Sequence, residues 1–224
     1  MSLIKSETLA WIKRRGLVPV LRASSVEQAL LLARAMYAGG IDVMEVTTTV
    51  PNAAEVMRLL RREFGDSMLI GAGTVTTADE CAELLEVNAQ FVVSPSLHPE
   101  VIEATRRAGK LMIGGALTPT EIVTAHRAGA DIVKVFPCSA MGGASYLRSI
   151  KGPFPRIPLI PTGGVTLATA HEFLRAGAIA LGVGSDLVDE AAIRRGEPER
   201  VTETARKYLA IVAAWQSDSE FQWS

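Results

Sequence analysis

The sequence of 224 residues predicts an α/β protein, a (β/α)8 TIM barrel with an extra N-terminal helix. Two observations support this fold. Eight short apolar runs are almost unbroken by polar residues, as in parallel strands that are covered on both faces. A Gly or Asn precedes seven of these runs, at intervals of 20 to 26 residues that suit one helix and one strand each. Eight such units close into a barrel, whereas the alternative, a doubly wound open sheet, usually has fewer strands.

The predicted strands alternate with amphipathic stretches along the chain. The strands cover residues 17–21, 43–46, 68–70, 91–93, 111–113, 132–135, 157–160 and 179–183. An extra amphipathic helix is expected over residues 3–14, before the first strand. Residues 26–37 and 201–215 place apolar side chains at helical spacing, so each predicts a helix that packs one face on the sheet.

Capping residues mark the predicted helix ends. Ser24 or Ser25 can cap the helix that follows, and Thr76 and Thr118 precede similar helix starts. The C-terminal ends of the predicted helices are marked by seven residues that tolerate a left-handed backbone conformation, and we expect that conformation at each of them. These residues are Gly39, Gly65, Asn88, Gly109, Gly129, Gly152 and Gly177.

Composition and charge restrict the class of protein. The apolar content of 48% supports a large core, and we expect one domain over residues 1–224. The net charge of −1 is not the positive excess of a nucleic-acid-binding protein, so no nucleic-acid partner is expected. No apolar run is long enough to span a membrane, so no membrane partner is expected either. The first residues lack an apolar signal core, and two cysteines form no disulfide framework, so we expect a cytoplasmic protein with free thiols. The polar tail over residues 216–224 is expected to fray or to dock on a neighbour.

Two charged residues lie inside predicted strands. Lys134 interrupts an apolar run, and a buried neutral amine is the nucleophile of Schiff-base chemistry. The alternative is a lysine that extends to solvent at the strand end. Glu45 shares one strand face with Val43 and Thr47, and there it can act as a proton shuttle or as the structural partner of Lys134. The other lysines lie on helix patterns or in turns, where we expect solvent around the amine.

Glycine-rich turns end the seventh and eighth predicted strands. Gly163 and Gly164 lie in the first turn, and Gly184 and Ser185 lie in the second. The loops after these two strands form the common phosphate site of such barrels, because backbone N–H groups can approach an anion there. Arg22 ends the first strand, which neighbours the eighth in a closed barrel, so it can pair with the same phosphate unless it is an ordinary surface residue.

The remaining polar candidates indicate neither a metal nor a cofactor. His98, His126 and His171 have no metal-ligand spacing, so no metal site is expected. Cys138 follows the sixth strand without an evident histidine partner, and we interpret it as a packing residue rather than a nucleophile.

Five motifs, each at the end of a predicted strand, together resemble one family. They are Glu-Val-Thr at 45–47, Gly-Ala-Gly-Thr-Val at 71–75, Ser-Pro at 94–95, Lys-Val-Phe-Pro at 134–137 and Pro-Thr-Gly-Gly-Val at 161–165. In this order they resemble the KDPG/KHG aldolase family over about residues 10–190. The resemblance implies a class I aldolase without a cofactor that reversibly cleaves a 2-keto-3-deoxy-6-phospho sugar acid to pyruvate and glyceraldehyde 3-phosphate.

The resemblance also implies roles for single residues. Lys134 would form an imine with the keto acid and Glu45 would shuttle protons. The substrate carboxylate would bind near Gly73 and Thr74, with Pro95 and Phe136 lining the pocket. The phosphate would bind at Gly163, Gly164, Gly184 and Ser185. The family further implies a homotrimer whose partner is a small-molecule keto acid.

One position departs from the family pattern. The gluconate-type enzymes carry an arginine four residues after the glutamate, where this chain has Thr49. Arg22 resembles the arginine of the 6-phosphogalactonate branch, so the sugar-acid epimer and the need for a phosphate stay open. The alternatives are a 4-hydroxy-2-oxoglutarate aldolase that yields pyruvate and glyoxylate, a phosphate-binding barrel isomerase or epimerase, and a non-catalytic phosphosugar-binding protein.

Overall fold

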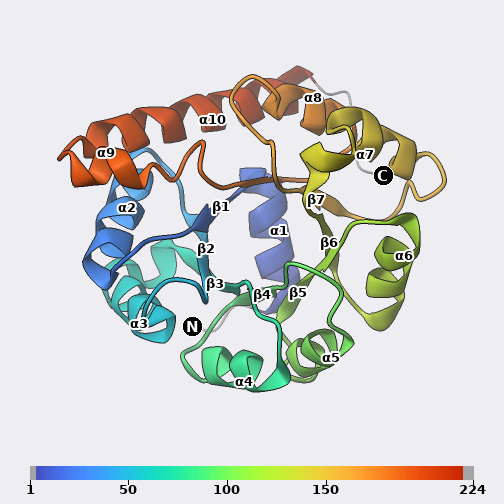
Figure 1. Ribbon diagram of the computed structural model, residues 1–224, viewed down its shortest axis with the longest axis horizontal. Helices are drawn as coiled ribbons and strands as arrows, with labels where there is room; N and C mark the ends of the chain where they lie inside the picture. The colour runs from blue at the N-terminus through green and yellow to red at the C-terminus, as the bar shows by residue number, and fades with distance from the viewer. Residues whose placement is uncertain (1–3, 219–224) are drawn as a thin grey trace.

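The computed structural model describes residues 4–218, which form a barrel of eight parallel strands inside a ring of helices (Figure 1). The strands are β1 (Leu17–Leu21), β2 (Val43–Thr47), β3 (Leu69–Gly73), β4 (Phe91–Val93), β5 (Leu111–Ala116), β6 (Ile132–Val135), β7 (Leu159–Pro161) and β8 (Leu181–Val183). Neighbours in sequence are neighbours in the sheet, and β8 also pairs with β1. A single bridge between Thr162 and Gly182 joins β7 to β8. The predicted barrel is confirmed.

Helices connect the strands and cover the outside of the barrel (Figure 1). They are α1 (Lys5–Arg15), α2 (Val26–Ala38), α3 (Ala53–Phe64), α4 (Ala78–Glu86), α5 (Pro99–Arg107), α6 (Pro119–Ala128), α7 (Ala144–Lys151), α8 (Ala170–Arg175), α9 (Glu190–Arg194) and α10 (Pro198–Asp218), with short 3-10 turns at Gly65–Ser67 and Cys138–Met141. No helix within residues 4–218 is long and apolar enough to cross a membrane.

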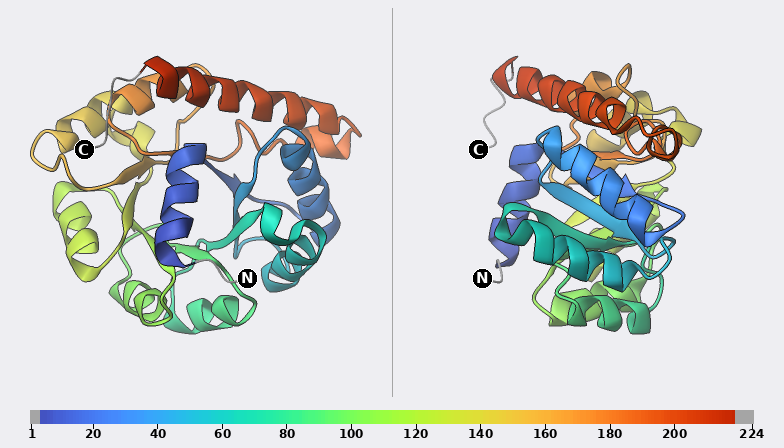
Figure 2. Two further views of the ribbon diagram at one scale, coloured as in Figure 1. Left: turned by 180° about the vertical axis from the view of Figure 1, so that it is seen from behind. Right: turned by 90° about the vertical axis from the view of Figure 1, so that its left-hand side faces the viewer.

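The helix before the first strand closes one end of the barrel. Figure 2 shows α1 lying across the back of the barrel, at the end where the strands begin. Its residue Ile12 is fully buried and packs in one cluster with inward-facing strand residues such as Val18, Val43 and Ile132. The predicted helix is confirmed from residue 5 onward, whereas residue 3 lies outside the described part. Within residues 4–218, α1 therefore closes this end, and the opposite end is left to admit a ligand.

Hydroxyl side chains cap several helices where the sequence predicts it. Ser25 Oγ accepts the N–H of Gln28 at the start of α2, and Thr118 caps α6. Thr76 precedes α4 as predicted, and the cap itself is Thr77, whose side chain accepts the N–H of Glu80. Thr76 lies one residue earlier, where its own N–H and hydroxyl donate to the Glu80 carboxylate.

Five of the seven predicted helix ends have a positive φ, although Gly65 combines it with a ψ of −132°, outside the left-handed helical region. Gly39 and Gly152 are wrong, with φ of −82° and −53°. Gly40 takes the left-handed conformation instead of Gly39, with φ of 97°. A Cβ on Gly39 would lie 2.5 Å from Ala205 Cβ, so glycine is needed there for the close approach of α10.

Element boundaries move by a few residues from the prediction. β3 extends to Gly73, past the predicted end at residue 70, because its glycines continue the ladder with β2. β7 and β8 each begin two residues later than predicted. α10 continues to Asp218, so residues 216–218 of the predicted tail are helical and the rest of that tail lies outside the described residues.

Candidate active site

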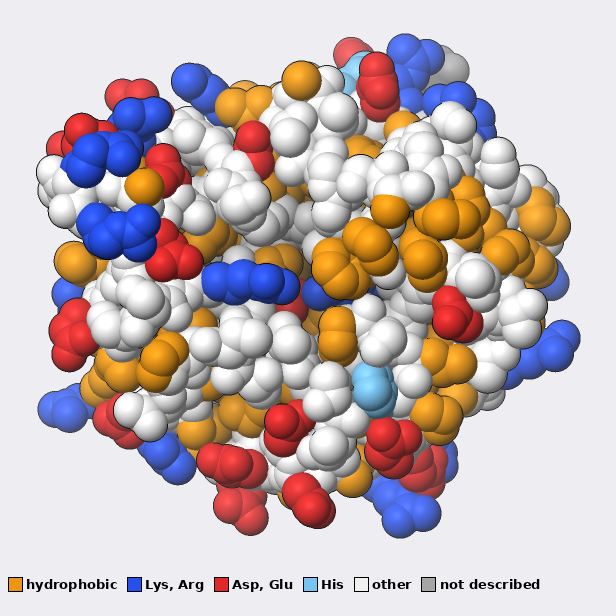
Figure 3. Space-filling model, viewed as in Figure 1, with side chains coloured by type: hydrophobic (Ala, Val, Ile, Leu, Met, Phe, Trp, Pro, Cys, Tyr) orange, Lys and Arg blue, Asp and Glu red, His pale blue; other side chains and the backbone are white. Residues whose placement is uncertain are grey.

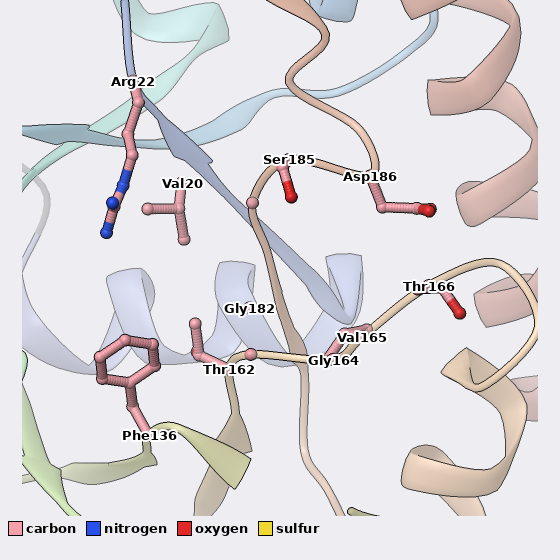
Figure 4. A pocket seen from close by; sticks show the side chains of 12 residues that line it. Val20, Arg22, Phe136, Thr162, Gly164, Val165, Thr166, Gly182, Ser185 and Asp186 are labelled. Atoms are coloured by element: carbon pink, nitrogen blue, oxygen red, sulfur yellow. The ribbon is translucent and has the colours of Figure 1, made fainter. Parts of the chain in front are cut away.

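The barrel opens at the carboxyl ends of its strands. A cavity of about 460 Å³ lies there, lined by the ends of β1, β6, β7 and β8 (Figure 4). Figure 3 shows basic side chains at the middle of this face, beside a group of hydrophobic ones. Six of the residues singled out from the sequence line the cavity, namely Arg22, Phe136, Gly163, Gly164, Gly184 and Ser185.

Lys134 and Glu45 meet inside the barrel. Lys134 comes from β6 and Glu45 from β2, and their residues are 4% and 2% exposed. Lys134 Nζ donates to Glu45 Oε1 at 3.4 Å, which makes a buried ion pair across the barrel. The Nζ atom also lies 5.7 Å from the ring centre of Phe136, which lines the cavity. The pair therefore lies next to the cavity while it is shielded from bulk water.

Gly73 makes room for the Glu45 carboxylate. A Cβ on Gly73 would lie 2.1 Å from Glu45 Oε1, so the carboxylate rests directly on the β3 backbone. Below it, a Cβ on Gly71 would lie 2.3 Å from the ring of Phe91, which is fully buried in the barrel. Two glycines of β3 therefore each leave room for a side chain inside the barrel, Gly71 for the Phe91 ring and Gly73 for the Glu45 carboxylate.

Other glycines keep the open end of the barrel from filling with side chains. A Cβ on Gly115 would lie 2.3 Å from Ser96 N, and one on Gly182 would lie 2.1 Å from Thr162 Oγ1. The interior of such a barrel is normally filled by bulky branched residues. The sequence places both glycines at the ends of predicted strands, but neither is among the predicted site residues, although their inward register in β5 and β8 is a usable signal.

Thr74 and Pro95 lie at the ends of β3 and β4, outside the lining of the cavity. Thr74 has a φ of 60°, uncommon for a residue with a Cβ, and Thr48 Oγ1 donates to its carbonyl at 3.0 Å. Pro95 is half-buried, and a Cβ on Gly115 would lie 2.4 Å from its carbonyl carbon. Thr74 follows Gly73 directly, which brings it close to the Glu45 carboxylate.

Two loops frame the other side of the cavity. Gly163 and Gly164 have φ of 85° and 75°, and a Cβ on Gly164 would lie 2.3 Å from Ser139 Cβ. In the second loop, the N–H groups of Leu187 and Val188 both donate to the carbonyl of Gly184. This tight turn presents the Ser185 hydroxyl to the cavity (Figure 4).

Arg22 extends from the end of β1 toward the space between these loops and Phe136 (Figure 4). It is exposed, and within the described residues it makes no ion pair. A guanidinium in this position is available to an anionic ligand. The Thr49 hydroxyl lies 2.7 Å from Thr47 Oγ1.

The remaining nucleophilic and metal-ligating side chains lie apart from the ion pair. Cys138 is fully buried, and burial raises the pKa of its thiol to about 11. His98 lies between Ser96 and Glu100, and His126 is 3.4 Å from the carbonyl of Ala130. Across residues 4–218, no three His, Cys, Asp or Glu side chains are placed to hold a metal ion.

Lys151 differs from the expectation of a solvated lysine. Its Nζ atom donates to the carbonyls of Pro155 and Ile157, and burial lowers the pKa of this amine. It lies at the end of α7 and does not line the cavity.

Comparison with known proteins agrees with this geometry. The family model described as KDPG and KHG aldolase matches residues 9–204. A 2-dehydro-3-deoxy-phosphogluconate aldolase of Pseudoalteromonas atlantica is 36% identical over 88% of this chain and 91% of its own. A 2-dehydro-3-deoxy-6-phosphogalactonate aldolase of Escherichia coli is 32% identical over 93% and 98% of the two chains.

A solved structure resembles the whole barrel. It is the KDPG aldolase of Legionella pneumophila, with pyruvate captured at low pH as a covalent carbinolamine intermediate. It matches with a TM-score of 0.82 and 34% identity, over 89% of this chain and 96% of that one. The family match, the relatives and the barrel agree, and the chain belongs to the KDPG and KHG aldolase family of carbon–carbon lyases.

Proposed function

We propose that this chain is a class I aldolase that reversibly cleaves a 2-keto-3-deoxy-6-phospho sugar acid to pyruvate and glyceraldehyde 3-phosphate. The observation that carries the proposal is the buried pair of Lys134 and Glu45, 3.4 Å apart beside an open cavity. A lysine that is shielded from water next to a carboxylate has both a nucleophile and a proton acceptor for imine chemistry.

Lys134 starts the reaction. A proton moves from Nζ to the Glu45 carboxylate across their contact, and the neutral amine attacks the keto carbon at C2. The resulting carbinolamine loses its hydroxyl as water, with protons supplied by Glu45, and a protonated imine forms. This imine is an electron sink next to the bond that will break.

Glu45 then serves as the general base. Directly or through a water molecule it takes the proton of the 4-hydroxyl, and the electrons of the C3–C4 bond move into the imine. The aldehyde leaves and an enamine stays on Lys134. The enamine takes a proton at C3, and water hydrolyses the imine to release pyruvate and the free amine. Every proton that Glu45 accepts in one step it returns in a later one.

The rest of the site would hold the two ends of the substrate. The phosphate binds at Gly163, Gly164, Gly184 and Ser185, which line the cavity, and Arg22 supplies a positive charge. The carboxylate binds near Thr74, beside Glu45. Phe136 lines the cavity between these ends, whereas Pro95 lies at the end of β4, outside the lining.

A smaller substrate is the second candidate. Position 49 holds a threonine whose hydroxyl bonds to Thr47, so it adds no positive charge to the site. The 4-hydroxy-2-oxoglutarate reaction, which yields pyruvate and glyoxylate, needs no phosphate site and would leave the glycine loops unused. Cleavage rates for the gluconate epimer, the galactonate epimer and 4-hydroxy-2-oxoglutarate, measured side by side, distinguish the three.

We also infer the setting in which the enzyme works. The chain acts as one domain, assembles as a homotrimer as its family resemblance implies, and works in a reducing compartment such as the cytoplasm. Two buried free cysteines suit such a compartment. Light scattering on the purified protein tests the trimer, and a monomer mass would contradict it.

Reductive trapping tests the assignment. Borohydride with labelled pyruvate should fix a three-carbon adduct on Lys134, and Lys134→Ala should abolish both the adduct and cleavage. Glu45→Gln should still trap adduct but turn over about a hundredfold or more slowly, the usual contribution of a general base. Lys151 is an internal control, because burial lowers the pKa of its amine too, but it lies outside the cavity. Label on Lys151 alone, or full activity of Lys134→Ala, would refute the assignment.

A further inference from the structure

Asp186 directly follows Ser185 but faces the other way. Figure 4 shows the Ser185 hydroxyl pointing into the cavity and the Asp186 carboxylate pointing away from it. Asp186 Oδ2 accepts the backbone N–H of Leu167 at 3.2 Å, and it accepts the hydroxyl of Tyr208. Leu167 belongs to the loop after β7, so this carboxylate connects the two loops that frame the cavity.

Tyr208 anchors this connection to the core. It lies on α10, is fully buried, and its hydroxyl is also 3.5 Å from the carbonyl of Val165. Burial and the hydrogen bond to Asp186 both raise the pKa of Tyr208. The hydroxyl therefore keeps its proton at neutral pH and donates to the Asp186 carboxylate.

A carboxylate at this place needs an explanation. Asp186 belongs to the loop after β8 and lines the cavity, and a negative charge there weakens anion binding by repulsion. Within the described residues Asp186 makes no ion pair that would neutralise it. Its hydrogen bonds instead hold the ends of both loops at a set separation, above the bridge between Thr162 and Gly182.

We propose that Asp186 and Tyr208 are positioning residues that set the distance between the loops after β7 and β8 and so tune the affinity for a phosphate group. This inference rests on the proposed function for the identity of the anion. Donors that converge on one anion bind it well only when their spacing matches it. The pair acts on the phosphate end of the substrate and not on the chemistry at Lys134.

Two substitutions separate positioning from charge. Tyr208→Phe keeps the ring in the core but removes the hydroxyl, and Asp186→Ala removes both hydrogen bonds at an exposed loop residue. If Asp186 and Tyr208 position the two loops, both variants should raise the KM of the phosphorylated substrate by about tenfold, with kcat changed less than about twofold. A purely electrostatic role predicts the opposite sign for Asp186→Ala, because the repulsion would be lost.

The matched control is Tyr37→Phe. Tyr37 lies on α2, where its hydroxyl is 3.1 Å from Ser67 Oγ and does not touch the cavity. This variant loses a tyrosine hydroxyl without any effect on the loops, so its kinetic constants should equal those of the parent. Exchange of the methyl protons of pyruvate, which needs Lys134 but no phosphate, should be unchanged in all three variants.

Titration with inorganic phosphate provides a test that does not depend on turnover. Calorimetry on the full chain should show weaker phosphate binding in Tyr208→Phe and Asp186→Ala than in the parent or in Tyr37→Phe. Unchanged phosphate binding in Asp186→Ala, tighter binding in that variant, or an equal loss of pyruvate exchange would each overturn the proposal. If the parent traps no pyruvate and the variants still bind phosphate more weakly, the proposed function fails and the positioning role stands.

Discussion

Gly73 should be indispensable for catalysis, although it carries no side chain. A Cβ at this position would lie 2.1 Å from Glu45 Oε1 and 2.3 Å from its Cγ, whereas ordinary contact begins near 3.4 Å. In Gly73→Ala the carboxylate must therefore retreat by about 1 Å or more. It can move only away from the β3 backbone, toward Lys134 or toward the packed wall of the barrel.

The expected cost has two parts. Overpacking of a closed interior should lower the free energy of unfolding by about 1–3 kcal/mol, visible as a lower melting temperature. A displacement of about 1 Å in a catalytic group should lower kcat by about a hundredfold, which is about 2.7 kcal/mol in activation free energy. The pyruvate adduct on Lys134 should still form, because its nucleophile stays in place.

The assay compares kcat for release of pyruvate, adduct formation and thermal unfolding in Gly73→Ala and in a matched variant. Gly152→Ala is the control, since a Cβ there would meet its nearest neighbour, Ser149 O, at 3.5 Å. Gly152 ends α7 with a φ of −53°, which alanine adopts readily, so we expect a change in stability of less than about 1 kcal/mol. A Gly73→Ala enzyme with kcat within about twofold of the parent would refute the view that this glycine holds the carboxylate.

Three further predictions concern the rest of the site. Arg22→Ala should raise the KM of phosphorylated substrates by about tenfold or more while pyruvate exchange stays unchanged, and equal effects on both would show that Arg22 does not bind the phosphate. EDTA should leave cleavage intact because the imine supplies the electron sink, so a loss that a divalent ion restores would favour a metal-dependent aldolase. Since the pKa of Cys138 is about 11, its thiol is protonated at pH 7.5, and iodoacetamide at that pH should neither label it nor reduce activity. Inactivation through Cys138 would show that this buried position opens to solvent.

Much of the fold is readable from local patterns. Each strand is a short apolar run that needs cover on both faces, and each helix shows its buried side by its own spacing. The exact helix ends were less readable. A local argument does not distinguish Gly39 from Gly40, yet only Gly40 has a positive φ, and Gly39 is glycine because Ala205 of α10 approaches it closely.

The residues of the site also fall into two groups, those that the sequence identified and those that it did not. Lys134 and Glu45 stood out because each interrupts an apolar run, which is an observation on neighbouring residues alone. The glycine turns after β7 and β8 were also visible, because their composition and their order along the chain identify them. Tyr208 and Asp186 gave no such signal, since a tyrosine on the apolar face of a helix has the pattern of an ordinary core residue.

The sequence by itself determined the kind of barrel, the order of its strands and the residue types at their ends, because these depend on short-range periodicity and on the handedness of the connections. Only the tertiary structure decided which side chains meet. Glu45 and Lys134 are 89 residues apart, and their 3.4 Å contact exists because β2 and β6 face each other across the closed barrel. Distances of that kind depend on how the strands curve and on which inward positions are glycine, so they are set by the packing of the whole chain.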